Sequence, residues 1–139
     1  MAMEVFRKRI LTFLYTFLLG LFQTQRVKRK KEKGDHYQWR LCVDVPYFFT
    51  SKFSIDNNTV TVTGTQCTYD HSWPIRYSII KVSHFGLRTE YVDSIVINGD
   101  QCEKEFKHTF ENIPNGEDYQ LEVCNYFRYY SEGDIRLLK

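Results

Sequence analysis

Residues 113–123 constrain the fold more than any other stretch of this chain. They begin with an apolar residue, continue through a Pro-Asn-Gly turn and end with Tyr119, Leu121 and Val123 at alternate positions. Alternating apolar residues are typical of a strand that buries one face, and a turn of this kind before a fixed aromatic is how a β-sandwich turns a corner. The segment therefore predicts an all-β fold.

The same period of two recurs from His36 to the C-terminus and predicts strands rather than helices. In the clearest example, Val60 and Val62 face inward and the intervening threonines face outward. Similar alternation groups Leu41, Val43 and Val45 on one face of the first strand. Seven strands are predicted, at residues 38–45, 59–66, 75–83, 90–97, 103–110, 119–127 and 135–138. Seven short strands in about 100 residues are typical of an immunoglobulin-like sandwich.

Residues 1–25 have the layout of a secretory signal peptide. Three basic residues at positions 7–9 precede a run of thirteen uncharged residues, 10–22, and a polar stretch follows. The run is shorter than the roughly 20 apolar residues of a membrane span. We therefore expect a hydrophobic leader helix that acts as a signal peptide. A retained signal anchor and an organellar transit peptide are the alternatives.

Residues 26–36 form a basic linker before the predicted domain at 37–139. Its first four residues, Arg-Val-Lys-Arg, resemble a furin-like processing site that ends at Arg29. The alternatives are a solvated linker and a basic flank that keeps the domain in the cytosol next to an anchor. Residues 30–139 hold thirteen Lys or Arg against sixteen Asp or Glu, so no basic stripe indicates a nucleic-acid partner.

Four cysteines and one sequon fit an oxidising compartment. The even number of cysteines suits two disulfides, although buried free thiols are the alternative. Neither their spacing nor the histidines, including His71 and His108, suggests a metal site. Asn57 begins an Asn-Asn-Thr acceptor for N-glycosylation at a predicted turn. The cysteines are Cys42, Cys67, Cys102 and Cys124.

Three segments resemble the fibronectin type III family. Residues 59–65 are similar to its second strand, residues 74–79 to its third strand with a Tyr-x-aliphatic pattern, and residues 113–123 to its corner and sixth strand. The resemblance covers residues 37–139 and implies a seven-stranded sandwich. It also implies that Cys67 and Cys102 lie at the same end of one sheet and can pair, which leaves Cys42 and Cys124 as the second pair, with all three connectivities still open.

No catalytic motif, phosphate-binding loop or cofactor-binding pattern is present in the sequence. His108 alternates with Phe106 and Phe110, as expected of a half-buried strand residue. We therefore predict a non-enzymatic protein without a small-molecule cofactor.

The strongest binding signal is an accumulation of aromatic residues in two loops. In fibronectin type III domains the loops after the second and sixth strands share one end, which implies that the two segments meet. Tyr, Phe, Trp and Arg are enriched at binding hot spots. The alternative is that Tyr126 or Phe127 completes the core. The candidate contact residues are Tyr69, Trp73, Tyr126, Phe127, Arg128, Tyr129 and Tyr130.

The sequence thus predicts a small secreted or luminal protein that binds an extracellular protein, either receptor or ligand, through these loops. A membrane-anchored subunit of an assembly is the first alternative, with membrane contact through a retained leader. A lipid carrier of the ML type is the second, and it requires an apolar pocket between the sheets.

Overall fold

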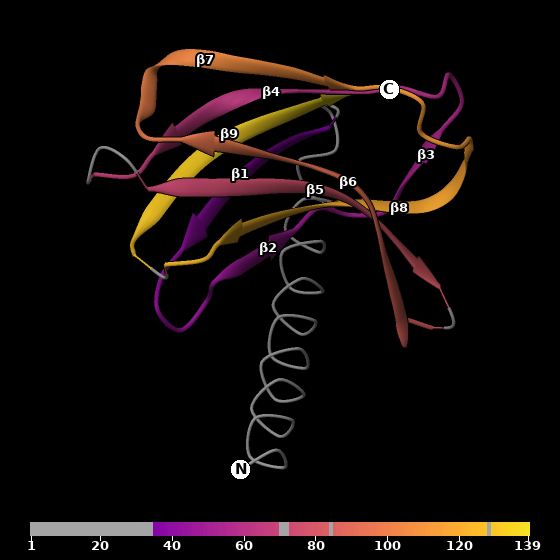
Figure 1. Ribbon diagram of the computed structural model, residues 1–139, viewed down its shortest axis with the longest axis horizontal. Helices are drawn as coiled ribbons and strands as arrows, with labels where there is room; N and C mark the ends of the chain where they lie inside the picture. Colours follow the sequence, from indigo (N-terminus) through magenta and orange to yellow (C-terminus); the bar gives the residue numbers. More distant parts are fainter. Residues whose placement is uncertain (1–34, 70–72, 84, 128) are drawn as a thin grey trace.

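The computed structural model describes residues 35–69, 73–83, 85–127 and 129–139. In this part of the chain nine strands form two antiparallel sheets, whose strands overlap in the view of Figure 1. The predicted leader, the basic linker up to residue 34, Arg29, His71 and Arg128 lie outside the described residues. No helix long and apolar enough to cross a membrane is found in the described part.

The first sheet has the strand order β1-β9-β4-β7. These strands are β1 (His36–Leu41), β9 (Ser131–Leu138), β4 (Val60–Cys67) and β7 (Gln101–Phe110). The second sheet has the order β2-β8-β5-β6, and β3 also pairs with β8. Its strands are β2 (Tyr47–Phe49), β8 (Gly116–Asn125), β5 (Pro74–Ser83), β6 (Arg88–Asn98) and β3 (Phe53–Ile55).

The two-sheet sandwich confirms the predicted fold class, but the number of strands was wrong. Two strands of three residues each, β2 and β3, occupy a stretch where no strand was expected. Between them the backbone NH of Thr50 donates to Leu121 O at 3.0 Å, and the Thr50 hydroxyl accepts from the backbone NH of Leu121 at 2.9 Å. The chain thus stays beside β8 without the alternating pattern by which longer strands are detected.

The strand order also differs from the one that the fibronectin type III resemblance implied. In immunoglobulin-like sandwiches the last two strands pair within one sheet. Here β8 belongs to the second sheet, whereas β9 inserts between β1 and β4 of the first sheet. Taking β2 and β3 together as one interrupted strand gives the order of a jelly roll, which consists of two interleaved Greek keys.

Aromatic and aliphatic side chains from both sheets fill the interior. Trp39 of β1 contacts Tyr77 of β5 edge to face, with ring centroids 6.4 Å apart, and both residues are fully buried. Val60 and Val62 point inward as predicted, as do Tyr77 and Ile79. This continuous core argues against the lipid-carrier alternative, which requires open apolar space between the sheets.

The first strand shows a smaller correction. β1 begins at His36, one residue before the predicted domain boundary, and ends at Leu41 rather than at residue 45. A tight turn follows, in which Cys42 and Val45 exchange backbone hydrogen bonds of 3.0 and 3.2 Å. Leu41 is buried as predicted, but Val43 is 64% exposed, because the chain has already left the sheet.

Residues 113–123 form the predicted corner. Ile113 is buried, and its backbone NH donates to Asn58 O at 2.9 Å. The chain then turns into β8, where the buried Tyr119 donates its hydroxyl hydrogen to Pro114 O at 2.5 Å. A tyrosine that bonds back to the backbone a few residues upstream is the standard way in which sandwich domains fix this corner.

Candidate functional site

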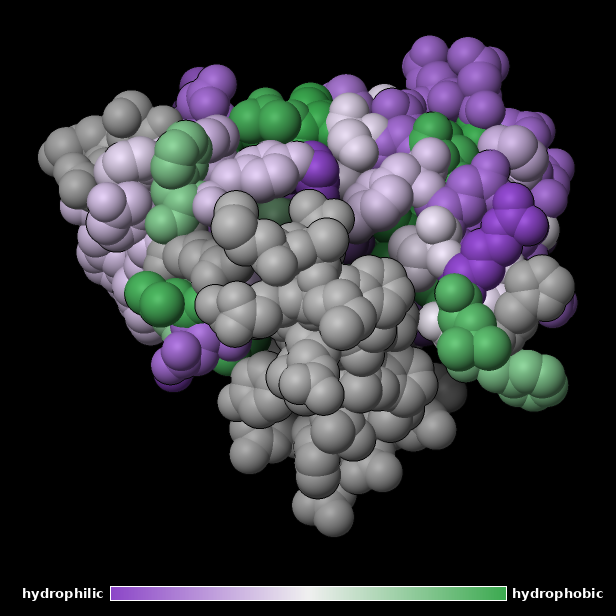
Figure 2. Space-filling view, turned by 60° about the horizontal axis from the view of Figure 1, so that its bottom comes forward, coloured by the Kyte–Doolittle hydropathy of each residue, from purple (hydrophilic) through white to green (hydrophobic). Residues whose placement is uncertain are grey.

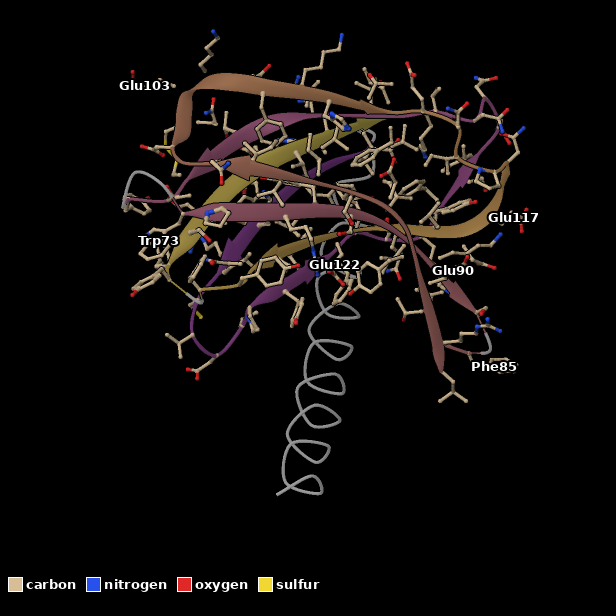
Figure 3. The ribbon with its side chains drawn as sticks, viewed as in Figure 1. Trp73, Phe85, Glu90, Glu103, Glu117 and Glu122 are labelled. Atoms are coloured by element: carbon tan, nitrogen blue, oxygen red, sulfur yellow. A yellow bond between two sulfur atoms is a disulfide. The ribbon has the colours of Figure 1, made fainter. Side chains whose placement is uncertain are left out.

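The loops after β4 and β8 meet at one end of the sandwich, as the sequence predicted. Their side chains form two groups of contacting aromatic rings. We call this surface the aromatic end, and Trp73 marks it at the left of Figure 3. Its described residues are Tyr69, Trp73, Tyr126, Phe127, Tyr129 and Tyr130.

The first group is centred on Trp73, immediately before β5. The ring of Tyr129 stacks on it with centroids 4.4 Å apart, and the ring of Phe127 lies 4.9 Å away at an angle of 47°. Asn125 fixes the β8–β9 loop beneath these rings, because its side-chain amide donates to Tyr129 O at 2.6 Å and its side-chain oxygen accepts from the backbone NH of Phe127 at 3.1 Å.

The second group consists of Tyr69, Tyr130 and Glu132. Both tyrosine hydroxyls donate to the Glu132 carboxylate, at 2.5 and 2.9 Å, and their ring centroids lie 5.7 Å apart. These hydrogen bonds raise the pKa of Tyr69 and of Tyr130 and lower the pKa of Glu132, because they favour the neutral phenols and the charged carboxylate. Arg40 lies 3.5 Å from the same carboxylate.

Tyr126 leads from the aromatic end onto the outer face of the second sheet. Its ring and that of Tyr91 both pack against the Arg76 guanidinium, at 4.6 and 5.3 Å, and its hydroxyl accepts a hydrogen bond from Arg76. Arg76 also forms an ion pair of 3.0 Å with Glu122, which is buried although it lies on the outer side of β8. Tyr91 donates its hydroxyl hydrogen to the other carboxylate oxygen of Glu122 at 2.7 Å.

The backbone near Trp73 is held by buried polar contacts. Gln66 donates to Ile97 O at 3.0 Å and to Gly99 O at 2.7 Å, and accepts from the Tyr77 hydroxyl at 3.0 Å. Gly99 in turn donates its backbone NH to Trp73 O at 3.1 Å. A chain of hydrogen bonds therefore runs from the core to the aromatic end. Gln66 has the inward parity of Val60 and Val62, but sequence patterns did not single it out, because a polar residue interrupts the apolar alternation at this position.

The aromatic rings keep large exposed surfaces despite these contacts. Tyr69, Tyr126, Phe127, Tyr129 and Tyr130 are 49–61% exposed, so the alternative that Tyr126 or Phe127 completes the core is wrong. Figure 2 shows residues of intermediate hydropathy, drawn pale, on the left of the molecule, the side on which Figure 3 labels Trp73. The Nε1 atom of Trp73 is buried without a hydrogen-bond partner.

The predicted pairing of Cys67 with Cys102 is confirmed, with their Cα atoms 4.8 Å apart. The predicted pairing of Cys42 with Cys124 is wrong, because both are free thiols. Cys42 lies in the turn after β1 of the first sheet, whereas Cys124 lies on β8 of the second sheet, with the outward parity of Glu122. Burial first, and then the charge of Glu122, raises the pKa of the Cys124 thiol to about 11.

The other candidate residues lie as follows. Asn57 is exposed in the turn between β3 and β4, where an acceptor asparagine is accessible. His108 is half-buried on β7, and its ring lies edge to face with that of Phe110. The cluster of Cys67, Asp100 and Cys102 has the spacing of metal ligands, but its two sulfur atoms are joined in the disulfide.

No family model matches the chain, and no curated protein matches it. Among solved structures, the pre-peptidase C-terminal domain of collagenase from Bacillus anthracis has a TM-score of 0.49 at 13% identity, over 74% of this chain and 87% of its own. PirA has a TM-score of 0.49 at 11% identity, over 75% and 94% of the two chains. A family 16 carbohydrate-binding module has a TM-score of 0.40 at 9% identity, over 74% and 71%. Likenesses this distant do not indicate a function.

Proposed function

We propose that this protein is a non-enzymatic binding domain that contacts an extracellular or luminal protein through its aromatic end. The proposal rests on one observation: five aromatic side chains at this end are about half exposed and yet are held in place by contacts with their neighbours. Each is fixed by ring contacts or hydrogen bonds, so little side-chain entropy is lost on binding. Aromatic side chains that combine apolar rings with hydroxyl groups are the commonest anchors of protein interfaces.

The secretory route is part of the same proposal. Three features support it: a signal-like segment at residues 1–25, the Cys67–Cys102 disulfide and the exposed acceptor at Asn57. Expression in a eukaryotic secretory host followed by intact-mass analysis tests this route. We expect a chain shortened at its N-terminus that gains two hydrogen atoms on reduction and loses mass on removal of N-glycans. A full-length chain with four free thiols and no glycan would contradict it.

Site-specific photocrosslinking tests the binding surface. A benzoyl-phenylalanine probe at Tyr130 is compared with the same probe at Leu138, which is 62% exposed at the other end of β9. After incubation with extracellular fluid or cell surfaces from the source, we expect one protein to be linked from position 130 and not from position 138. Equal labelling from both positions, or carbohydrate rather than protein at position 130, would reject the proposed contact.

A further inference from the structure

The β5–β6 hairpin carries a second exposed apolar feature, at the opposite end of the molecule. Phe85 at its tip and Trp73 at the aromatic end lie at opposite sides of Figure 3. The side chains of Phe85 and Leu87 are 102% and 87% exposed, more than any other large hydrophobic residue in the described ranges. In Figure 2 a green projection at the lower right matches the place of this hairpin.

The backbone at the tip makes the choice of residue unusual. Phe85 and Gly86 have φ values of 57° and 85°, the two successive left-handed conformations of a tight hairpin turn. Asn or Asp is preferred in the first of these positions, and a bulky side chain with positive φ is disfavoured. At this position phenylalanine gains no stability from burial, and the backbone conformation disfavours its bulky side chain. Its exposed ring therefore points to a contact outside the described chain.

The shape of the tip favours a lipid layer as that contact. A stable protein interface covers about 800 Å² on each partner with complementary surface, whereas this feature consists of two side chains on a narrow projection. Insertion into the boundary between acyl chains and headgroups needs no complementary shape and rewards the burial of Phe and Leu.

The charges beside the tip are mixed, and one of them is an exposed cation. Arg88, the first residue of β6, is exposed next to Leu87 and can meet lipid headgroups, although Glu90 follows two positions later. Lys81 lies further from the tip, with its ammonium group 5.0 Å above the ring of Tyr119. We propose that the tip of the β5–β6 hairpin is a membrane-contact site that inserts Phe85 and Leu87 into a phospholipid bilayer.

Such an orientation turns the aromatic end away from the membrane and leaves it free for a protein partner. The lipid contact is independent of the protein-binding function proposed above, because the two surfaces share no residue. The proposed lipid contact is also separate from any membrane contact made through the uncharged run at residues 10–22.

A tryptophan probe at the tip tests the proposal in the full-length chain. The only native tryptophans are Trp39, which is buried, and Trp73 at the far end, so residues 1–34 contribute no tryptophan signal. The F85W variant is mixed with vesicles of brominated phosphatidylcholine and phosphatidylserine. We expect its additional emission to shift to shorter wavelength and to lose at least half its intensity relative to non-brominated vesicles. The L87W variant should behave alike, which guards against a folding defect in one variant.

The control is V43W, because Val43 is 64% exposed in the turn after β1, and Leu41 at the end of β1 pairs with Ser131, next to Tyr130 of the aromatic end. The tryptophan emission that this substitution adds should be equal with brominated and with non-brominated vesicles. The proposal is overturned if the probes at 85 and 87 stay unquenched, whether or not the chain sediments with the vesicles, or if V43W is quenched to the same degree. Probes that respond only to an added protein would reassign the tip to a protein pocket.

Discussion

Glu122 is the residue whose position is hardest to explain from the chain alone. Its carboxylate is buried although it belongs to the outward-facing set of β8, and Arg76 and Tyr91 bond to its two oxygens. A buried charge is tolerated only when it is paired and hydrogen-bonded. The alternation rule placed Glu122 correctly on the outer face of the sheet, but it could not reveal that side chains from β5 and β6 cover it.

This arrangement predicts unequal effects of single and double substitutions. Arg76→Leu leaves the Glu122 carboxylate buried without its cation, so we expect the free energy of unfolding to fall by about 3 kcal/mol. Adding Glu122→Leu removes the unpaired charge and should restore most of that loss. Urea unfolding of the wild type and the two variants measures the difference. A double variant less stable than Arg76→Leu would show that the pair is not the cause.

Glu132 predicts a change in tyrosine titration. Because its carboxylate accepts hydrogen bonds from Tyr69 and Tyr130, Glu132→Gln should lower the pKa of both phenols toward the ordinary value near 10. Ultraviolet difference titration against the wild type measures this shift. The folded-state pKa of Glu132 is lowered, so any stabilisation is present above its unfolded pKa and is lost as pH falls through the folded value. The thermal midpoints of the two proteins should therefore converge in acid.

At the scale of elements, periodicity predicted long strands well and short ones poorly. Residues 60–67 alternate cleanly because one face packs on the core and the other meets solvent. β2 and β3 are too short to show a period, and their edge position depends on Thr50 and Gln120, whose hydrogen bonds span 70 residues of sequence. Long-range contacts of this kind leave no local signal.

The side chain of Gln66 on β4 forms hydrogen bonds with residues of β5 and β6, so its replacement should lower the stability of the fold. Gln66→Leu leaves the buried Tyr77 hydroxyl and two carbonyl oxygens without this partner, so we expect a loss of about 3 kcal/mol in unfolding free energy. Gln38→Leu on the exposed side of β1 is the matched control and should change stability by less than about 0.5 kcal/mol. Chemical denaturation of both variants tests this, and equal effects would refute the role of Gln66.

At the scale of the whole molecule, the sequence predicted the sandwich and the meeting of two aromatic loops, but not the path of the last strand. The corner at Tyr119 is a local motif, so its residues could be recognised directly. The insertion of β9 between β1 and β4 is set by packing across the molecule, which no stretch of sequence encodes by itself. The wrong pairing of Cys42 with Cys124 came from counting cysteines rather than from geometry.

The corrected cysteine assignment predicts two free thiols and one disulfide in the folded chain. Alkylation under denaturing, non-reducing conditions should modify Cys42 and Cys124 only, as read by peptide mass mapping. The disulfide closes a loop with a sequence separation of 35, so Cys67→Ser/Cys102→Ser should lose about 4 kcal/mol of stability. Cys42→Ser should have little effect. A chain without free thiols would contradict the assignment.

The central claim is that the aromatic end binds a protein partner, and loss of affinity in a surface variant tests it most directly. Once the partner is identified by crosslinking, its dissociation constant is measured for the wild type, for Tyr69→Ala/Tyr130→Ala and for Leu138→Ala as the control. Removal of two hot-spot tyrosines should weaken binding about a hundredfold or more with the fold intact, whereas the control should bind like the wild type. Equal affinity for all three proteins would contradict the account.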